Sequence, residues 1–352
     1  MEKKERYALL PSVLLPWYEL NKRDLPWRKD RDPYHIWLSE IMLQQTRVEA
    51  VKGYYNRFIS KLPDIAAVAQ ADDDLLHKLW EGLGYYSRVR NLKKAAGIVM
   101  QVYNGCFPTA YNDVLALPGI GAYTAGAICS IAYNQPTPAV DGNVLRIISR
   151  ITADSTPTDL PAFKTSVQKK LAAVYPEEAG TFTQALMELG ATVCGPNREP
   201  ACFDCPCREF CKACAAGTWS EYPVRLPKRE RKEEDRTVFI LSCNGFYAMQ
   251  KRENTGLLAS MWQFPNIAGK LDVEQALQQV QSMGVVPENI LRQTDKTHIF
   301  THIQWNMRGF YIEVKETAGQ YQWMHWEQIR QQAALPTAFR QFCEPPFGQQ
   351  SV

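Results

Sequence analysis

Four cysteines near the middle of the chain are spaced closely enough to share one metal site. They follow the pattern C-x7-C-x2-C-x5-C and are Cys194, Cys202, Cys205 and Cys211. Deprotonated thiolates are soft, strongly donating ligands, so the run predicts an iron–sulfur cluster or a zinc ion. The spacing alone does not name the metal, and Cys207 and Cys214 are alternative ligands for the last position.

A glycine-containing turn lies upstream of the cysteines, in the segment LPGIGAYTAG. Gly119 and Gly121 flank Ile120, and a helix is expected to start near Ala122. Glycine permits positive backbone φ angles and close approach to a ligand, and the free amides of the following helix could bind a phosphate. An ordinary turn between two helices is the alternative interpretation.

Two acidic residues stand out by their surroundings. Glu40 lies within the apolar segment IWLSEIML, where burial would raise the pKa of its carboxyl group. Such a group can hold a proton at neutral pH, which suits a general acid. Asp141 precedes NVLRIISR, which indicates a helix start, so its ordinary role is that of an N-cap.

Composition limits the classes of protein that need to be considered. A length of 352 residues with 45% hydrophobic residues favours about two packed domains. We expect no membrane segment and no signal peptide, because no apolar run is long enough and no cleavage site follows the amino terminus. Ten cysteines without an export signal favour metal ligation in a reducing cytoplasm. The net charge of +3 does not by itself establish nucleic-acid binding.

The sequence patterns of the segments that must position these residues change from helical to strand-rich along the chain. Apolar residues at three- and four-residue spacing predict helices from Trp17 to about Cys214. A charged segment follows, and beyond Thr237 the dipeptide Asn244-Gly245 between β-rich runs predicts a hairpin. We therefore expect a helical domain over 1–216, a linker over 217–236 and a mixed α and β domain over 237–352.

Several motifs of the first domain together resemble a known family. They are LPWR at 25–28, WLSEIMLQQT at 37–46, GLGYYSR at 82–88, LPGIGAYTAG at 117–126 and VDGNVLR at 140–146. With the cysteine run, they resemble the helix-hairpin-helix superfamily of base-excision DNA glycosylases, and within it the MutY family of adenine DNA glycosylases. The resemblance implies a 4Fe–4S cluster rather than zinc. The family pattern has six residues in the first cysteine interval, whereas this chain has seven.

The resemblance also implies roles for individual residues. Glu40 would protonate adenine at N7 and later activate water, and Asp141 would stabilise the sugar cation. Asn143 and Tyr123 would orient the sugar and the leaving base. Tyr123 stands where related bifunctional enzymes carry a nucleophilic lysine, so a monofunctional enzyme is expected. Two further positions that match the adenine pocket of the family are Arg28 and Glu188.

DNA contacts follow from the same resemblance. Entry into the helix and flipping of the base would involve Gln44, Gln45 and Tyr85, together with the hairpin glycines. Taken alone, the glutamines suit an exposed helix face, and Tyr85 and Tyr86 suit a partly buried pair. The basic residues that we expect to neutralise phosphates are Arg88, Arg90, Lys93, Lys94, Arg146 and Arg150.

The second domain resembles the Nudix-like, MutT-type domain of the same family, through GLLASMWQFPN at 256–266 and IFTHIQW at 299–305. The helical stretch LDVEQALQQVQSM lacks the carboxylate-rich core that a Nudix hydrolase needs, so recognition without hydrolysis is expected. Phe300, Thr301 and His302 match the family's Phe-Ser-His loop, which reads 8-oxoguanine, with threonine in place of serine.

The expected function is a monofunctional adenine DNA glycosylase that starts base excision repair. Its partner would be duplex DNA in which adenine is mispaired with 8-oxoguanine or guanine. We expect a monomer, cytoplasmic and associated with a bacterial nucleoid. Two alternatives are an endonuclease-III-like glycosylase for oxidised pyrimidines and a non-catalytic iron–sulfur scaffold that binds DNA.

Overall fold

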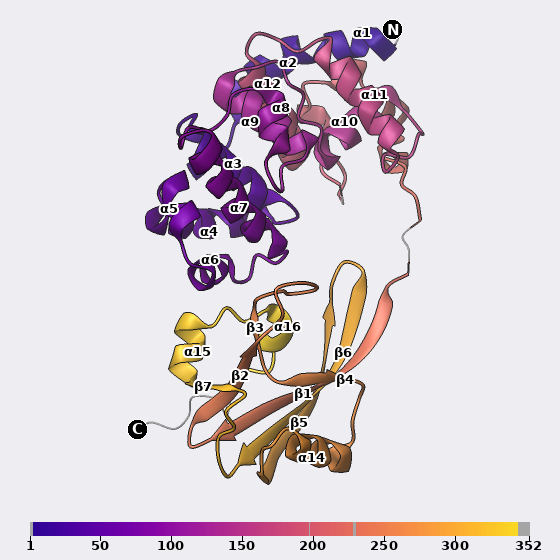
Figure 1. Ribbon diagram of the computed structural model, residues 1–352. Coiled ribbons are helices and arrows are strands. Elements are labelled where there is room, and N and C mark those ends of the chain that lie inside the picture. The colour runs from indigo at the N-terminus through magenta and orange to yellow at the C-terminus, as the bar shows by residue number, and fades with distance from the viewer. Residues whose placement is uncertain (1–2, 197, 228–229, 344–352) are drawn as a thin grey trace. The chain divides into compact units, whose positions relative to one another are not determined.

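The computed structural model describes residues 3–196, 198–227 and 230–343, and the chain divides into two units (Figure 1). The first unit combines Met1–Gln70 with Asn91–Pro227, and the second combines Ala71–Arg90 with Lys228–Val352. No described helix is long and apolar enough to cross a membrane.

Helices build the first unit, as the sequence predicted. They are α1 (Lys3–Ala8), α2 (Leu10–Asn21), α3 (Pro33–Leu43), α4 (Val48–Lys61), α5 (Ile65–Gln70), α8 (Tyr111–Ala116), α9 (Ala122–Tyr133), α10 (Gly142–Thr152), α11 (Pro161–Ala172), α12 (Ala179–Thr192) and α13 (Lys212–Ala216). Helix α7 (Ser87–Val102) spans the sequence boundary between the units. Single 3-10 turns are η1 (Pro26–Arg28), η2 (Cys202–Asp204), η3 (Arg208–Phe210) and η4 (Trp219–Glu221).

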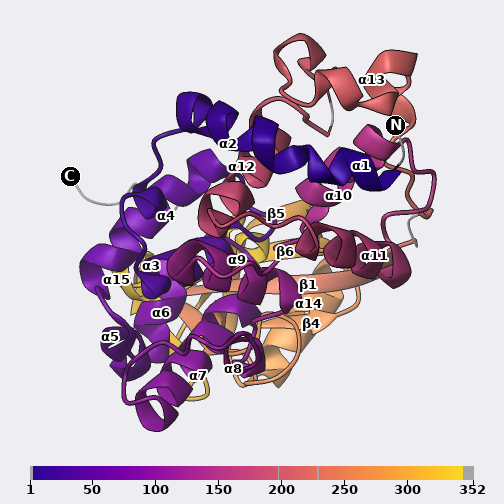
Figure 2. The same cartoon turned by 90° about the horizontal axis from the view of Figure 1, so that it is seen from above.

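Helix α12 is central to the apolar core of this unit. It packs against α2, α9 and α10, and α2 lies beside it (Figure 2). Leu14, Ile147 and Leu186 from three of these helices are buried in one cluster. Gly180 allows the close approach of α12 to α9, because a Cβ atom there would lie 2.8 Å from the carbonyl oxygen of Ser130.

The predicted glycine turn joins α8 to α9. Gly119 has φ of 79°, and a Cβ atom there would lie 2.7 Å from the Cβ of Asn91, so both conformation and space require glycine. Gly121 has extended backbone angles and is the N-cap of α9. The helix begins at Ala122, as the sequence predicted.

A mixed sheet forms the centre of the second unit. Its strands are β1 (Lys232–Cys243), β2 (Phe246–Lys251), β3 (Trp262–Gln263), β4 (Asn266–Ala268), β5 (Pro287–Ile299), β6 (Ile303–Val314) and β7 (Gln322–His325). Among the described residues the order is β3-β2-β1-β6-β5, with β4 paired to β1 and β7 to β2. Strands β1 and β6 are parallel, and the other pairs are antiparallel. The helices of this unit are α6 (Asp73–Trp80), α14 (Val273–Ser282), α15 (Trp326–Gln332) and α16 (Thr337–Arg340).

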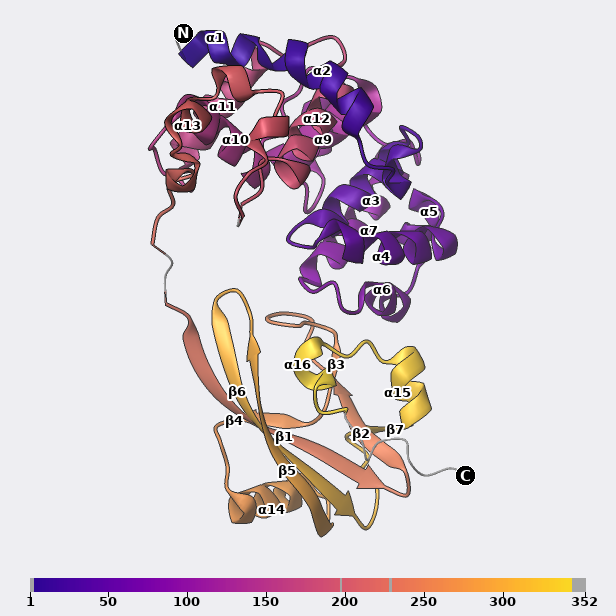
Figure 3. The ribbon, with the colours of Figure 1, turned by 180° about the vertical axis from the view of Figure 1, so that it is seen from behind.

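Helices cover both faces of this sheet (Figure 3). Successive residues of a strand point to opposite faces, and β1 is apolar on both. Phe239 packs with Ala276 of α14, whereas Val238 packs with Phe339 of α16. The predicted Asn244-Gly245 turn joins β1 to β2, and both residues have positive φ.

The charged segment before Thr237 differs from the expected linker. Strand β1 begins at Lys232, and Lys232 pairs with Ile303 at the start of β6. The first residues of β1 are mostly exposed, so their charges stay solvated while their backbone groups bond to the neighbouring strand. The expected linker over 217–236 therefore overlaps the first strand from Lys232 onward.

Candidate active site

Glu40 and Tyr123 meet at the wall of a cavity in the first unit. Asp32 is the N-cap of helix α3, and its side chain accepts a hydrogen bond from the Tyr34 amide at 2.8 Å. The helix carries Glu40 to a position that is 5% exposed. The hydroxyl of Tyr123, in the first turn of α9, donates to Oε2 of Glu40 at 2.5 Å. Burial raises the pKa of Glu40 to about 7, although this hydrogen bond opposes the rise.

Asp141 lies at the N-terminus of α10, where it is the predicted N-cap. Its Oδ1 accepts from the amide of Val144 at 2.8 Å, and its Oδ2 accepts from the side-chain amide of Asn143 at 2.6 Å. Burial raises the pKa of Asp141, and these hydrogen bonds oppose the rise. The N-cap role and a place in the cavity are thus compatible, because each oxygen of the carboxyl group has a separate donor.

The buried Arg146 orients the side chain of Asn143 through a hydrogen bond. Nη2 of Arg146 donates to Oδ1 of Asn143 at 2.8 Å and to the Gly190 carbonyl at 2.9 Å, while Nε donates to the Cys194 carbonyl at 2.9 Å. Because the Asn143 oxygen accepts from Arg146, its amide nitrogen faces Asp141. Gly190 leaves room for this arrangement, since a Cβ atom there would lie 2.6 Å from the Cβ of Asn143.

This geometry corrects part of the predicted phosphate contacts. Arg146 and Arg150 are each 3% exposed, and Arg88 is 8% exposed. All three donate hydrogen bonds to carbonyl groups of the protein. The prediction that these arginines neutralise phosphates was wrong, because a charge at the surface of an isolated helix becomes interior once neighbouring elements pack over it.

The cavity has a volume of about 530 Å³ and brings together most of the predicted site residues of the first unit. Those that line it are Arg28, Glu40, Gln44, Gln45, Tyr123, Asp141, Asn143 and Glu188. The sequence interpretation missed five polar or aromatic lining residues, Arg23, Trp27, Ser39, Thr46 and Gln184. Gln184 precedes Glu188 by one helical turn on α12, and this spacing could have revealed it.

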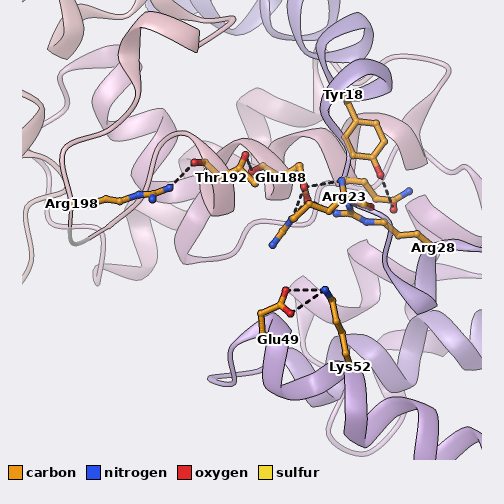
Figure 4. Close-up of polar contacts among 9 residues, drawn as sticks. Tyr18, Arg23, Arg28, Glu49, Lys52, Glu188, Thr192 and Arg198 are labelled. Atoms are coloured by element: carbon orange, nitrogen blue, oxygen red, sulfur yellow. Dashed lines mark hydrogen bonds and ion pairs between the residues drawn. The ribbon is translucent and has the colours of Figure 1, made fainter.

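Two arginines surround Glu188, which is completely buried (Figure 4). Its Oε1 accepts from the backbone amide and Nε of Arg23, at 3.1 and 2.6 Å. Its Oε2 accepts from Nη2 of Arg23 at 3.0 Å and from Nη2 of Arg28 at 2.7 Å. Burial would raise the pKa of Glu188, but the bonds from Arg23 and Arg28 outweigh it and hold the pKa below the usual value.

The cysteines surround a second, smaller cavity. It is lined by the four predicted ligands, Cys194, Cys202, Cys205 and Cys211, and also by Cys207 and Cys214. Nη1 of Arg150 donates to Sγ of Cys194 at 3.2 Å, which places a buried cation beside the thiols. A backbone hydrogen bond from Ala201 to the Val193 carbonyl, at 3.1 Å, closes the interval that contains the extra residue.

The donors fit an iron–sulfur cluster. Sulfur is the ligand atom for such clusters, and the turns η2 and η3 carry the thiols to one cavity. No group of three His, Cys, Asp or Glu side chains within the described ranges is placed to hold a single metal ion. A cluster separates its ligands further, because each thiolate binds a different iron atom.

This chain is similar to known proteins over most of its length. Residues 38–171 match the model of the HhH-GPD superfamily base excision DNA repair protein, and residues 237–344 match the NUDIX domain. The adenine DNA glycosylase of Rattus norvegicus is 34% identical over 93% of this chain and 76% of its own length. The Homo sapiens enzyme is 34% identical over 96% of this chain and 74% of its own length.

This chain belongs to the adenine DNA glycosylase family. The expected enzyme class and the two-part fold are thereby confirmed. A thermostable thymine-DNA glycosylase has a TM-score of 0.55 and 28% identity, with 60% of this chain and 98% of that chain covered. An endonuclease III structure has a TM-score of 0.52 at 21% identity, with 62% and 98% covered, and shares the fold.

Predicted DNA-reading residues of the glycosylase also meet within the second unit. The hydroxyl of Tyr85 lies 2.8 Å from Oγ1 of Thr301. Tyr85 is 46% exposed and has φ of 47°, whereas Tyr86 is buried, so the alternative of a partly buried pair does not describe Tyr85. In the first unit Gln45 likewise has a positive φ of 60°.

The loop between β5 and β6 presents Thr301 and His302 at an exposed tip. The Phe300 amide donates to the Ile303 carbonyl at 2.8 Å and closes the loop. The Phe300 ring packs edge-on against Trp305 at a centroid distance of 4.9 Å. Phe300 therefore anchors the loop, and the two polar residues remain accessible.

Proposed function

We propose that this glycosylase removes adenine paired with 8-oxoguanine or guanine in duplex DNA and so starts base excision repair. One observation carries the proposal: a buried carboxyl group, Glu40, with its pKa raised to about 7, shares one cavity with Asp141. Cleavage of an N-glycosidic bond needs an acid for the leaving base and a negative group near the sugar cation.

Glu40 acts first, as general acid. The flipped adenine enters the cavity, and the carboxyl proton of Glu40 passes to N7. The C1′–N9 bond then breaks, its electron pair stays with the protonated base, and adenine leaves as a neutral molecule. Tyr123 holds the Glu40 carboxyl group through its 2.5 Å hydrogen bond during this step.

Asp141 acts next, through its negative charge. The carboxylate stabilises the positive charge at C1′, and the donors Val144 and Asn143 hold it in place. Glu40, now deprotonated, takes a proton from water as the water oxygen bonds to C1′. The product is an abasic site. Tyr123 offers no amine for a Schiff base, so the reaction stops there without strand scission.

Arg28 and Glu188 form the wall of the pocket that receives adenine. Gln44 and Gln45, which line the cavity, and the turn at Gly119 and Gly121 bind the DNA strand. The hairpin precedes α9, whose first-turn amides can accept a phosphate.

Thr301 reads the 8-oxoguanine that remains in the helix, with Phe300, His302 and Tyr85 as further contacts. The proposal is supported by the 2.8 Å contact between the hydroxyl groups of Tyr85 and Thr301. This contact places an exposed aromatic ring next to the polar tip of the loop. A ring of this kind can wedge between base pairs, and a hydroxyl group can bond to a base edge.

Cys194, Cys202, Cys205 and Cys211 would hold a 4Fe–4S cluster, whose binding would stabilise the fold around these cysteines. Cys207 and Cys214 are the alternative ligands. The enzyme acts as a monomer on the bacterial nucleoid in the cytoplasm.

Duplexes that carry adenine opposite 8-oxoguanine, adenine opposite guanine, or an oxidised pyrimidine test this proposal. We expect strand breaks at adenine only after alkali, and faster with 8-oxoguanine than with guanine. Glu40→Gln should abolish excision and leave DNA affinity largely intact. Cleavage of the oxidised pyrimidine, efficient scission without alkali, or near-normal excision by the variant would contradict it.

A further inference from the structure

All the acceptor positions of Glu188 are already used inside the protein. The two oxygens accept four N–H groups, three from Arg23 and one from Arg28, and the side chain is 0% exposed (Figure 4). A carboxylate has about four acceptor sites. A base amino group would have to displace one of these charge-assisted bonds to reach Glu188.

Arg28 is held from three sides. Its Nη2 bonds to Glu188, its Nη1 donates to the Arg23 carbonyl at 3.2 Å, and its guanidinium lies over the Tyr18 ring at 5.5 Å. The Tyr18 hydroxyl in turn donates to Oε1 of Gln184 at 3.1 Å. A planar guanidinium group that is already held by several hydrogen bonds loses little conformational entropy when it binds a ligand.

The charge of Arg28 also affects the pKa of the proposed general acid, Glu40. Its positive charge opposes the burial-driven rise in the pKa of Glu40, and it lines the same cavity. Glu188 balances one of the two positive charges in this cluster. Without that carboxylate, the guanidinium groups of Arg23 and Arg28 would be two like charges beside a partly buried wall, and they would repel each other.

We infer that Glu188 is a positioning residue, which acts with Arg23 to hold Arg28 at the adenine pocket and does not itself contact the base. This inference rests on the proposed function of the cavity and deepens it. It predicts that Glu188 matters only through Arg28. It also predicts that Glu188 does not sense the amino group of adenine.

A double-mutant cycle tests the first consequence. Single-turnover excision opposite 8-oxoguanine is measured for Glu188→Gln, Arg28→Ala and the double variant. We expect a loss of about 10- to 100-fold for each single variant, and a double variant within about threefold of Arg28→Ala. Losses that multiply in the double variant would overturn the inference.

A substrate change tests the second consequence. Purine lacks the 6-amino group of adenine, and each variant is compared with the wild type on both bases. We expect Glu188→Gln to lose the same factor on adenine and purine, whereas a loss confined to adenine would show direct contact. Arg23→Lys keeps the positive charge but loses the paired N–H donors of the guanidinium group. It should reduce the excision rate by a smaller factor, which is again equal on both bases.

Two controls separate this inference from other failures. Glu327→Gln breaks an exposed ion pair with Arg330 and should change nothing. If Glu188→Gln does not fold, Arg23→Lys carries both tests in its place, judged by its melting temperature. A wild-type enzyme that excises no adenine would instead overturn the proposed function.

Discussion

The Tyr123 hydroxyl donates to the Glu40 carboxylate at 2.5 Å, across 83 residues of sequence, and it opposes the effect of burial on the acid. Burial favours the protonated carboxyl group, whereas a donated hydrogen bond favours the carboxylate. The balance leaves the pKa of Glu40 at about 7, which is suited to an acid that must give and then take a proton at neutral pH.

Tyr123→Phe should raise the pKa of Glu40 above the wild-type value, because it removes a bond that lowers it. The acid step needs the protonated form, so single-turnover excision should fall as pH rises through the pKa. We expect the midpoint of this fall near pH 7 in the wild type and at higher pH in the variant. A midpoint that stays in place or moves down would contradict this account of the pair.

Asp141→Asn separates the two roles of this residue. Asparagine is as good an N-cap as aspartate, so α10 and the melting temperature should be nearly unchanged. The negative charge is lost, and excision should fall by about 10²- to 10³-fold. Circular dichroism and single-turnover kinetics on one preparation check both parts. Excision within a few-fold of wild type would leave Asp141 with the N-cap role alone.

Gly190→Ala should disturb the active site by displacing Asn143. The added Cβ would lie 2.6 Å from the Cβ of Asn143, so α12 or Asn143 must move. We expect a destabilisation of about 1–3 kcal/mol and at least tenfold slower excision. Gly97→Ala is the matched control, since its Cβ meets nothing within 4 Å, and it should be neutral or stabilising.

Thr301→Val tests lesion reading with little change in shape. It removes one hydroxyl group, and the preference for adenine opposite 8-oxoguanine over guanine should fall by about tenfold, the value of one hydrogen bond. Thr301→Ser keeps the hydroxyl and should keep the preference. Single-turnover rates on the two duplexes give the ratio. An equal preference in all three proteins would argue against a role for this hydroxyl.

Cys211→Ser and Cys207→Ala distinguish the ligands of the cluster. We expect a brown protein with visible absorbance, and a marked loss of iron and of melting temperature in Cys211→Ser. Cys207 is 1% exposed within the apolar core, so Cys207→Ala should lose only some packing energy and keep its iron. The reverse pattern of iron contents would exchange the two assignments.

The sequence by itself determined features that depend on near neighbours in the chain. Helix periodicity, the Asp141 N-cap, the turn at Gly119 and the Asn244-Gly245 hairpin are local, because each depends on backbone conformations and hydrogen bonds within a few residues. The motifs around Glu40 and the cysteines likewise sufficed to indicate the enzyme family.

Only the tertiary structure decided which charges are buried and which partners they have. Arg146 was expected at a phosphate but is enclosed by α12, where it orients Asn143. Glu188 was expected at the adenine pocket and lines the cavity, but only the structure shows that its partners are Arg23 and Arg28, from a segment far away in the sequence. Burial and pairing of charges depend on distant segments that pack together, and local sequence patterns do not contain that information.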